Sequence, residues 1–173
     1  MMINSTQNLV INDVFLIADS SPLIALAGVN RLNLLPRLYS RVIAPSAVIT
    51  EILAGGQNAS GRDFLDSASW LEHRTLGQTT ELISMALGPG ETEVIQLAKQ
   101  LPNSRLLLDD HRARRVAENL NLEIIGSAGI LVQAKRKMLI REVVPILRNM
   151  KNNGYYIGDR VIQRAALAVG ETV

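Results

Sequence analysis

Four short apolar segments, each followed by a segment with helical spacing, constrain the fold of this chain more than any other feature. A short continuous apolar run is typical of a strand buried on both faces of a parallel sheet. The predicted strands are Phe15–Ala18, Val42–Ala44, Leu106–Leu108 and Glu123–Ile125. Their alternation with helices, and the rule that crossovers are right-handed, predict an α/β fold with a parallel sheet and helices on both faces.

Helical patterns account for most of the remaining chain, which has 173 residues and 47% hydrophobic residues. The predicted helices cover approximately Leu23–Ala27, Leu32–Tyr39, Ser46–Leu53, Asp63–Ser69, Thr79–Leu87, Gly90–Leu101, Arg112–Leu120, Ser127–Met138, Glu142–Lys151 and Asp159–Val169. Residues 70–76 are expected to form a weaker strand or an extended segment, and residues 57–60 a loop. We expect one domain over residues 1–173, with residues 1–13 as an N-terminal extension.

Composition excludes several kinds of site. The chain has no cysteine and only two histidines, so a disulfide framework, a thiol nucleophile and a cysteine or histidine zinc site are not expected. No apolar stretch approaches the roughly 20 residues that span a bilayer. The polar start of the chain lacks the residue order of a signal peptide. We therefore expect a cytoplasmic protein with no membrane partner.

Charge is distributed unevenly along the chain. Residues 1–100 contain 6 Lys and Arg against 9 Asp and Glu, and residues 101–173 contain 12 against 7, which gives −3 and +5. This asymmetry fits an anionic partner on one side of the protein, and it fits solvated helical surfaces equally well. Lys135–Lys137 with Arg141 form a basic stretch that either follows an RNA backbone or ends a helix in water.

Asp19 directly follows the first predicted strand and precedes a helix in which Pro22 suits the first turn. Ligands of open α/β sheets bind outside the carboxyl ends of the strands, which makes Asp19 a candidate site residue. Its alternative role is an N-cap for the helix, a position that favours Asp and Ser. The recurrence of acids at comparable places along the chain favours a site.

Glu51 and Glu91 lie on the apolar faces of their predicted helices. Glu91 precedes Val94 and Ile95 by three and four residues, whereas Glu93 is out of phase with them and is expected to face water. A carboxylate on the core side is costly unless it is paired or bound to a cation. The alternatives are a partner for the helix dipole in the case of Glu91 and a rim position in the case of Glu51.

Asp109 and Asp110 end the third predicted strand and should emerge at the same sheet edge as Asp19. One of the pair is expected to cap the following helix, which leaves the other free to face a ligand. Asp109 is the fourth candidate site residue, with Asp110 in reserve for that position.

Four carboxylates at one end of a parallel sheet repel one another at neutral pH. A hard divalent cation resolves this repulsion, and Mg²⁺ prefers oxygen ligands while it keeps several waters. A site of this kind activates water and stabilises the leaving oxygen in phosphodiester cleavage. The chain has no P-loop, dinucleotide-binding fingerprint or Ser-His-Asp order that points to another chemistry.

Four ordered motifs resemble the PIN-domain superfamily, and in particular the PIN-like branch that opens with D-S-S-P-L-I and includes VapC-like toxins of toxin–antitoxin pairs. The motifs are Asp19–Ile24, Pro45–Glu51, Gly88–Ala98 and Leu107–Arg114. Further similarity at Ile125–Leu131 and Ala168–Glu171 extends the match from about Val14 to Glu171.

The resemblance implies a three-layer α/β/α sandwich with a mainly parallel sheet. It also implies a Mg²⁺- or Mn²⁺-dependent endoribonuclease that hydrolyses RNA through a Mg²⁺-bound water. Carried over by position, the metal-binding and catalytic acids fall on Asp19, Glu51, Glu91 and Asp109. A cognate antitoxin and a homodimer are the protein partners that such toxins imply.

Two other functions remain open beside the nuclease. A PIN-like fold can serve only as a binding or scaffold module, although the presence of all four acids favours the nuclease. A phosphoacceptor receiver domain also places acids at strand ends, but it requires a Lys after a later strand, where Ile124 and Ile125 are followed by Gly126.

The C-terminal helical region carries more apolar residues than one core-facing stripe requires: Val143, Val144, Ile146, Leu147 and Met150, followed by Tyr155 and Tyr156. Such a surface either marks an interface, here between two copies of the chain, or simply covers the sheet. Aromatic residues make up only 3% of the chain, so the sequence offers little for the stacking of single-stranded bases.

Overall fold

The computed structural model describes residues 14–55, 60–77 and 87–173, which fold around one five-stranded sheet. All strand pairings are parallel, in the order β3-β2-β1-β4-β5. The strands are β1 Phe15–Ala18, β2 Val42–Pro45, β3 Leu71–Arg74, β4 Ser104–Leu107 and β5 Glu123–Ile125. The predicted parallel sheet is confirmed, and the weaker segment at 70–76 contains the edge strand β3.

β1 is the middle strand, and its side chains are buried on both faces of the sheet. Ile17 lies opposite Ile43 of β2 and Leu106 of β4, and none of these three residues has solvent-exposed surface. This position explains why the strand is a continuous apolar run rather than an alternating one. Asp19 follows it directly, and its N–H donates to the carbonyl of Leu107 at 3.1 Å. Asp19 therefore lies in the middle of the row of carboxyl strand ends, which we call the sheet edge.

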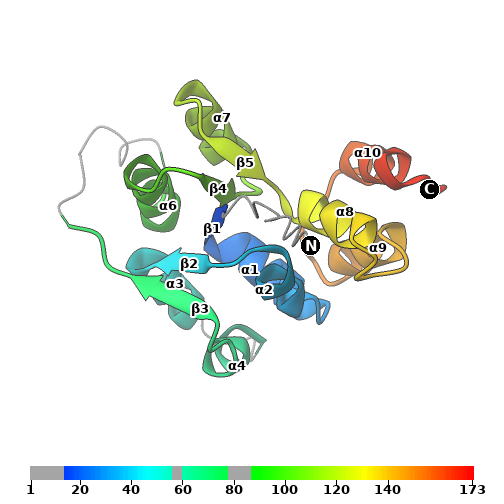
Figure 1. Ribbon diagram of the computed structural model, residues 1–173. Helices are drawn as coiled ribbons and strands as arrows, with labels where there is room; N and C mark the ends of the chain where they lie inside the picture. Colours follow the sequence, from blue (N-terminus) through cyan, green and yellow to red (C-terminus); the bar gives the residue numbers. More distant parts are fainter. Residues whose placement is uncertain (1–13, 56–59, 78–86) are drawn as a thin grey trace, which may run out of the picture.

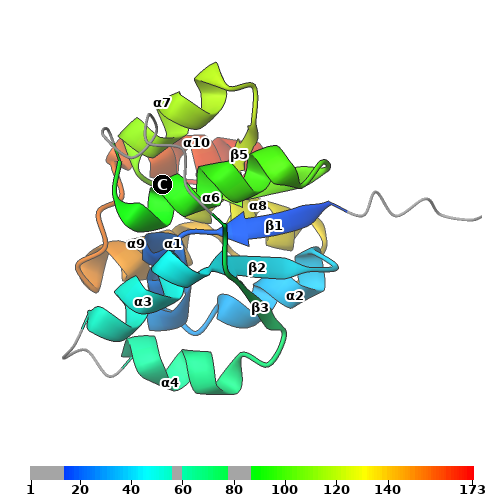
Figure 2. The same ribbon diagram turned by 90° about the vertical axis from the view of Figure 1, so that its left-hand side faces the viewer.

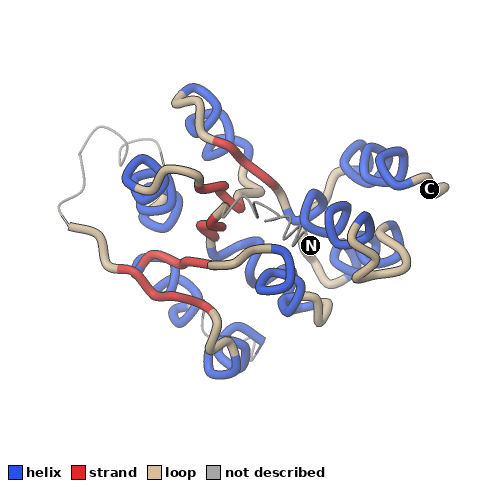
Figure 3. Tube along the Cα trace, in the orientation of Figure 1, coloured by secondary structure: helices blue, strands red, loops and turns tan. Residues whose placement is uncertain are grey.

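Helices cover both faces of the sheet (Figures 1 and 3). One face carries α6 Pro89–Gln100, which packs on β1, β2 and β4, and α7 His111–Asn119, which packs on β5. The other face carries α1 Ser20–Gly28, the 3₁₀ helix η1 Leu32–Leu34, α2 Leu35–Leu38 and α8 Ser127–Arg136. The α/β/α sandwich is therefore confirmed.

The remaining helices extend these layers. They are α3 Ser46–Ala54, α4 Ser60–Ser67, α9 Val144–Asn152 and α10 Asp159–Val169. α3 packs against both α1 and α6, and Figure 2 shows β1 and β2 ending on the side where α1 and α3 begin. α10 packs on α8 and α9 and forms the outer edge of the molecule (Figure 1). Of the helices described, none is long and apolar enough to cross a bilayer.

The carboxylate of Glu171 fastens this outer layer to α8 and α9. It accepts the N–H groups of Val143 and Val144, at 2.7 and 2.8 Å, and pairs with the ammonium of Lys135 at 2.6 Å. Arg136 donates to a carbonyl of α10 at 3.3 Å. Two side chains of the basic stretch therefore bind the C-terminal segment of the same chain, which weakens the interpretation of that stretch as an RNA path.

Several helix and loop boundaries differ from the prediction. The segment expected as one helix at 32–39 is divided into η1 and α2, because Pro36 has no N–H to continue the helical ladder. The helix expected at 79–87 lies outside the described residues except for Leu87, which is not helical. The loop expected at 57–60 also lies outside them except for Ser60, which begins α4.

Of the two interpretations left open for the apolar residues of the C-terminal helical region, the structure supports burial in the core for four of those at 143–150. Val143, Val144, Leu147 and Met150 are at most 3% exposed. They belong to the core because α9 packs against α1 and α10. Tyr156 is the exception in this region, with 93% of its surface exposed.

Replacement of a fully buried leucine in the central layer should destabilise the protein strongly. Leu106→Ala leaves a cavity in the middle of the sheet and is expected to lower the free energy of unfolding by about 2–5 kcal/mol. Leu167→Ala, at a leucine of α10 that is 81% exposed, is the matched control and should change it by less than about 0.5 kcal/mol. Urea unfolding followed by circular dichroism measures both, and equal effects would contradict the assignment of the core.

Candidate active site

Asp19 is a buried acid at the end of the central strand. Its residue is 2% exposed, and its Oδ1 atom is buried with no hydrogen-bond partner among the described residues. Although Asp19 occupies the N-cap position of α1, its side chain makes no capping hydrogen bond. The alternative role as an ordinary helix cap is therefore not what the side chain does.

Burial raises the pKa of the Asp19 carboxyl from 3.8 to about 7. The nearby N–H groups of Ser20 and Ser21 offset part of this effect, and the negative charges of Glu51 and Glu91 add to it. The Asp19 carboxyl is thus held beside two other acids. A cation at the sheet edge would supply a compensating positive charge.

Glu51 connects three helices through its carboxylate. Oε2 accepts the hydroxyl of Ser20 in α1 at 2.8 Å, and Oε1 accepts the N–H of Gly90 in α6 at 2.8 Å. A Cβ atom at position 90 would lie only 2.6–2.8 Å from the carboxylate atoms of Glu51, so the absence of a side chain there permits the contact. The half-buried Glu51 is thus a junction of α1, α3 and α6 rather than a simple rim residue.

Glu91 lies in the first turn of α6 and makes a capping contact. Its Oε2 accepts the N–H of Gly88 at 3.0 Å. Burial raises the pKa of Glu91, the Gly88 N–H opposes this, and the charges of Asp110 and Glu51 raise it further. Glu91 therefore combines the first-turn role with a place in the same electrostatic cluster as Asp19.

Glu93 does not simply face water, as its helical phase had indicated. It is only partly exposed, and its Oε2 accepts the N–H of Ala47 in the first turn of α3 at 2.8 Å. The prediction was wrong because the polar side of α6 packs on α3. Glu93 thus stabilises the start of the helix that carries Glu51.

The two adjacent aspartates after β4 have different roles. Asp110 caps α7, since its Oδ1 accepts the N–H groups of Arg112 and Ala113 at 2.8 and 3.0 Å. The structure therefore gives the capping role to Asp110, and the other member of the pair is Asp109. This agrees with the expectation that one acid caps the helix while its neighbour faces elsewhere.

Asp109 accepts three hydrogen bonds from the C-terminal half of the chain. The N–H of Ser127 donates to Oδ1 at 2.9 Å, and the hydroxyls of Ser127 and Tyr155 donate to Oδ2 at 2.5 and 2.6 Å. A Cβ at Gly126 would lie 2.7 Å from Oδ1 of Asp109, so the carboxylate lies close against that glycine. Burial raises the pKa of Tyr155, and the charges of Asp109 and, more weakly, Asp19 raise it as well.

The four candidate acids thus share one edge of the sheet but are held in different ways. Asp19, Glu51 and Glu91 influence one another electrostatically, whereas Asp109 is oriented by Ser127 and Tyr155. Within the described residues, no group of three or more Asp, Glu or His side chains is arranged so that it could hold a metal ion by itself. The unpartnered oxygen of Asp19 and the all-oxygen composition of the edge nevertheless fit Mg²⁺, which keeps several waters when it binds.

Four supporting residues were missed by the sequence interpretation. Ser20 adjoins Asp19 in the chain, and its proximity was the available signal. Ser127 and Gly90 were placed only at the starts of predicted helices, although a glycine that opens a helix also allows close approach. Tyr155 lies 46 residues from Asp109, and no local pattern connects the two.

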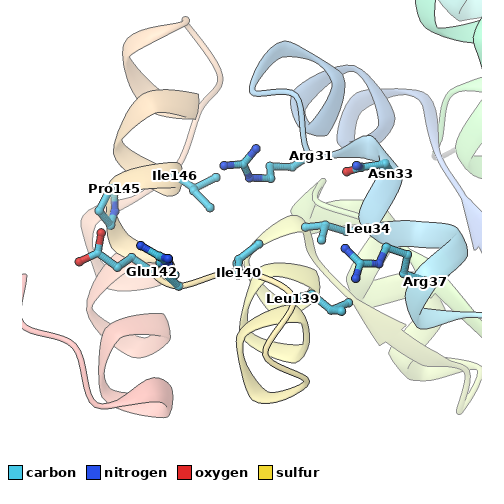
Figure 4. A pocket seen from close by; sticks show the side chains of 10 residues that line it. Arg31, Asn33, Leu34, Arg37, Leu139, Ile140, Glu142, Pro145 and Ile146 are labelled. Atoms are coloured by element: carbon cyan, nitrogen blue, oxygen red, sulfur yellow. The ribbon is translucent and has the colours of Figure 1, made fainter.

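A separate hollow of about 480 Å³ lies between the η1–α2 region and residues 139–146 (Figure 4). Arg31, Arg37 and Arg141 line it together with Glu142. None of the four candidate acids contributes to its lining. Its lining residues Arg31 to Arg37 follow the C-terminal end of α1 in the chain, whereas Asp19 lies at the N-terminal end of that helix. The hollow and the candidate active site are therefore distinct.

Comparison with known proteins defines the class to which this fold and this acidic edge belong. The family model described as PIN domain matches residues 15–171, and the chain belongs to the PIN-domain family. Among solved structures it is similar to a PilT N-terminus domain protein from the hyperthermophilic archaeon Sulfolobus solfataricus P2. That likeness has 18% sequence identity and a TM-score of 0.50, and covers 70% of this chain and 93% of the other. No curated protein matches the chain.

Membership of this family places the chain in a nuclease fold. PIN domains are generally nucleases that use divalent metals and act on nucleic acids. At 18% identity, the solved relative supports the fold alone.

Removal of the buried charge at Asp19 should stabilise the metal-free protein at high pH. Between pH 3.8 and about 7 the folded state holds a proton that the unfolded state releases, so stability falls as pH rises through this window. That interval corresponds to roughly 4 kcal/mol. The free energy of unfolding of Asp19→Asn is therefore expected to exceed that of the wild type by up to about 4 kcal/mol at pH 9 in EDTA. At pH 4 the two proteins should differ little, and urea unfolding measures both.

The exposed Asp66 of α4 provides the matched control. Asp66→Asn should show the same change in the free energy of unfolding between pH 4 and pH 9 as the wild type, because the side chain of Asp66 is exposed. An Asp19→Asn protein that is less stable than the wild type at pH 9 would contradict the buried, uncompensated charge.

Loss of the Tyr155 hydroxyl should cost stability because Asp109 then loses one of its three donors. Tyr155→Phe is expected to lower the free energy of unfolding by about 1–3 kcal/mol. Tyr156→Phe removes the same group from a side chain with no such contact and should have no measurable effect. Thermal or urea unfolding of the pair distinguishes them, and equal stabilities would show that the Tyr155–Asp109 hydrogen bond contributes nothing.

Proposed function

We propose that this protein is a metal-dependent endoribonuclease that hydrolyses RNA phosphodiester bonds. The observation that carries the proposal is the Asp19 carboxyl, which is buried beside Glu51 and Glu91 with one oxygen unpartnered. Buried acids with strongly perturbed pKa values cluster at functional sites, and a bound cation would compensate the negative charge of this carboxylate. The nuclease class of the PIN family supports the same conclusion.

Asp19, Glu51, Glu91 and Asp109 are the residues proposed to hold the cation, in part through waters. When bound, Mg²⁺ or Mn²⁺ supplies the acidity that makes a water nucleophilic at neutral pH and neutralises charge on the phosphate. The protein contributes oriented carboxylates. Ser20 and Gly90 fix that of Glu51, while Ser127 and Tyr155 fix that of Asp109.

We further propose that the protein acts as the toxin of a toxin–antitoxin pair and associates with a cognate antitoxin and with a second copy of itself. Its resemblance to VapC-like toxins supports these partners. The burial of Val143, Val144, Leu147 and Met150 removes the apolar helix surface that had also suggested a dimer. The dimer therefore rests on the resemblance alone.

A binding or scaffold module is the competing function. It is favoured by the hydrogen bonds that already occupy Glu91 and Asp109, since these acids also act as structural caps. It does not account for the unpartnered Oδ1 of Asp19. A cleavage assay separates the two functions.

Purified protein should cleave mixed single-stranded RNAs in the presence of Mn²⁺ and not in EDTA. Asp19→Asn keeps the shape of the side chain but removes the charge that attracts the cation. The cleavage rate should fall by at least about 100-fold, because even residues that only orient metal ligands are worth about 10- to 100-fold. Binding of RNA in EDTA should persist in this variant. Asp66→Asn is the control and should cleave like the wild type.

Two results would contradict the proposal. Equal Mn²⁺-dependent cleavage by wild type and Asp19→Asn would assign the activity to a contaminant or to another site. The absence of cleavage from both proteins, while both are folded and bind Mn²⁺ alike, would favour the scaffold function.

A further inference from the structure

A groove of about 690 Å³ runs from Asp109 along α8 and α10, and we call it the α8–α10 groove. Ser127 and Tyr155 line the end that adjoins Asp109. Val132 of α8 and Ala165 of α10 are among the residues along its length. Its volume falls within the range of about 300–1,000 Å³ that is typical of sites for small molecules and cofactors.

Aromatic residues are scarce in this chain, yet two of them adjoin one another in this groove. The whole sequence contains 2 Phe, 1 Trp and 3 Tyr, and Tyr155 and Tyr156 both line the α8–α10 groove. The hydroxyl of Tyr155 is committed to Asp109. Tyr156 is 93% exposed, so an aromatic face is available to a ligand beside the candidate active site.

Two arginines, Arg114 and Arg164, line the groove, and Asp109 is its one acidic lining residue among those described. Arg114 is anchored by a hydrogen bond of 2.9 Å to the carbonyl of Leu108. A largely apolar groove that carries two arginines and ends at a candidate catalytic acid suits a ligand with both apolar faces and negative charge.

We propose that the α8–α10 groove binds the single-stranded part of an RNA next to the phosphodiester bond that is cleaved. A base stacks on the ring of Tyr156, and the adjoining phosphates lie near Arg164. Aromatic faces combined with cationic side chains are the means by which proteins bind single strands without sequence preference. This inference rests on the proposed function, because it treats the groove as an extension of the site at Asp109.

A protein segment is the other occupant that an apolar groove can accept. The observations favour RNA for two reasons. The groove is continuous with Asp109, so its occupant lies against a candidate catalytic residue. Its two arginines are complementary to a polyanion, and Tyr156, at 93% exposed, presents more surface than Val161, at 43%.

The test measures binding of a labelled single-stranded RNA of about ten nucleotides to the full chain by fluorescence polarisation in EDTA, which prevents cleavage. Tyr156→Ala should weaken binding about tenfold, because one stacking contact is lost. Tyr156→Phe should bind within about twofold of wild type, since stacking requires the ring and not the hydroxyl. Arg164→Gln should also weaken binding and reduce the salt dependence by about one phosphate contact.

Leu167→Ala is the matched control on α10, because Leu167 is 81% exposed but does not line the groove. It should bind RNA like the wild type. A blunt duplex of the same sequence should compete poorly, because its bases are not available for stacking.

Three outcomes would overturn the inference: no RNA binding by the wild type in EDTA, equal binding by wild type and Tyr156→Ala, or equal losses in Tyr156→Ala and Leu167→Ala. If Tyr156→Ala leaves RNA binding intact but changes the mass measured by light scattering, the groove is a protein interface and the inference is also wrong. Failure of the nuclease proposal is distinguishable, since it would remove Mn²⁺-dependent cleavage while leaving the dependence of binding on Tyr156.

Discussion

The carboxylate of Glu51 joins three helices at one point, and the arrangement of the sheet edge depends on this junction. By accepting both the Ser20 hydroxyl and the Gly90 N–H, it sets the starts of α1 and α6 relative to α3. The same contact keeps a negative charge beside Asp19 and Glu91. The Glu51 carboxylate therefore both holds the helices together and adds negative charge beside Asp19 and Glu91. A substitution that removed its charge would reduce the repulsion among the acids and would also weaken the contacts between the helices.

The fold was predictable because its signals are local. Each buried strand is a short apolar run, and the central one is followed at once by an acid and a helix start, so periodicity and order define the sheet. Boundaries were less predictable. The division of one expected helix at Pro36 and the extension of β4 back to Ser104 depend on hydrogen bonds between segments that are distant in sequence.

The site was predictable only in part, because helical phase shows which side of a helix a residue occupies but not what packs against that side. Phase placed Glu91 on the side of α6 that carries Val94 and Ile95, and the partial burial of Glu91 agrees with that position. It failed for Glu93, because the polar side of the same helix packs on α3 and binds the N–H of Ala47. No periodicity reveals Tyr155, whose partner Asp109 comes from a different layer of the fold.

The position of Tyr155 in the chain has a consequence for the order in which the protein matures. All four candidate acids leave the ribosome before the serine and the tyrosine that orient Asp109, and Glu171, which fastens the outer helices, follows later still. Domains generally fold as units. A growing chain therefore carries the four candidate acids without their final geometry until α8, α9 and α10 have docked.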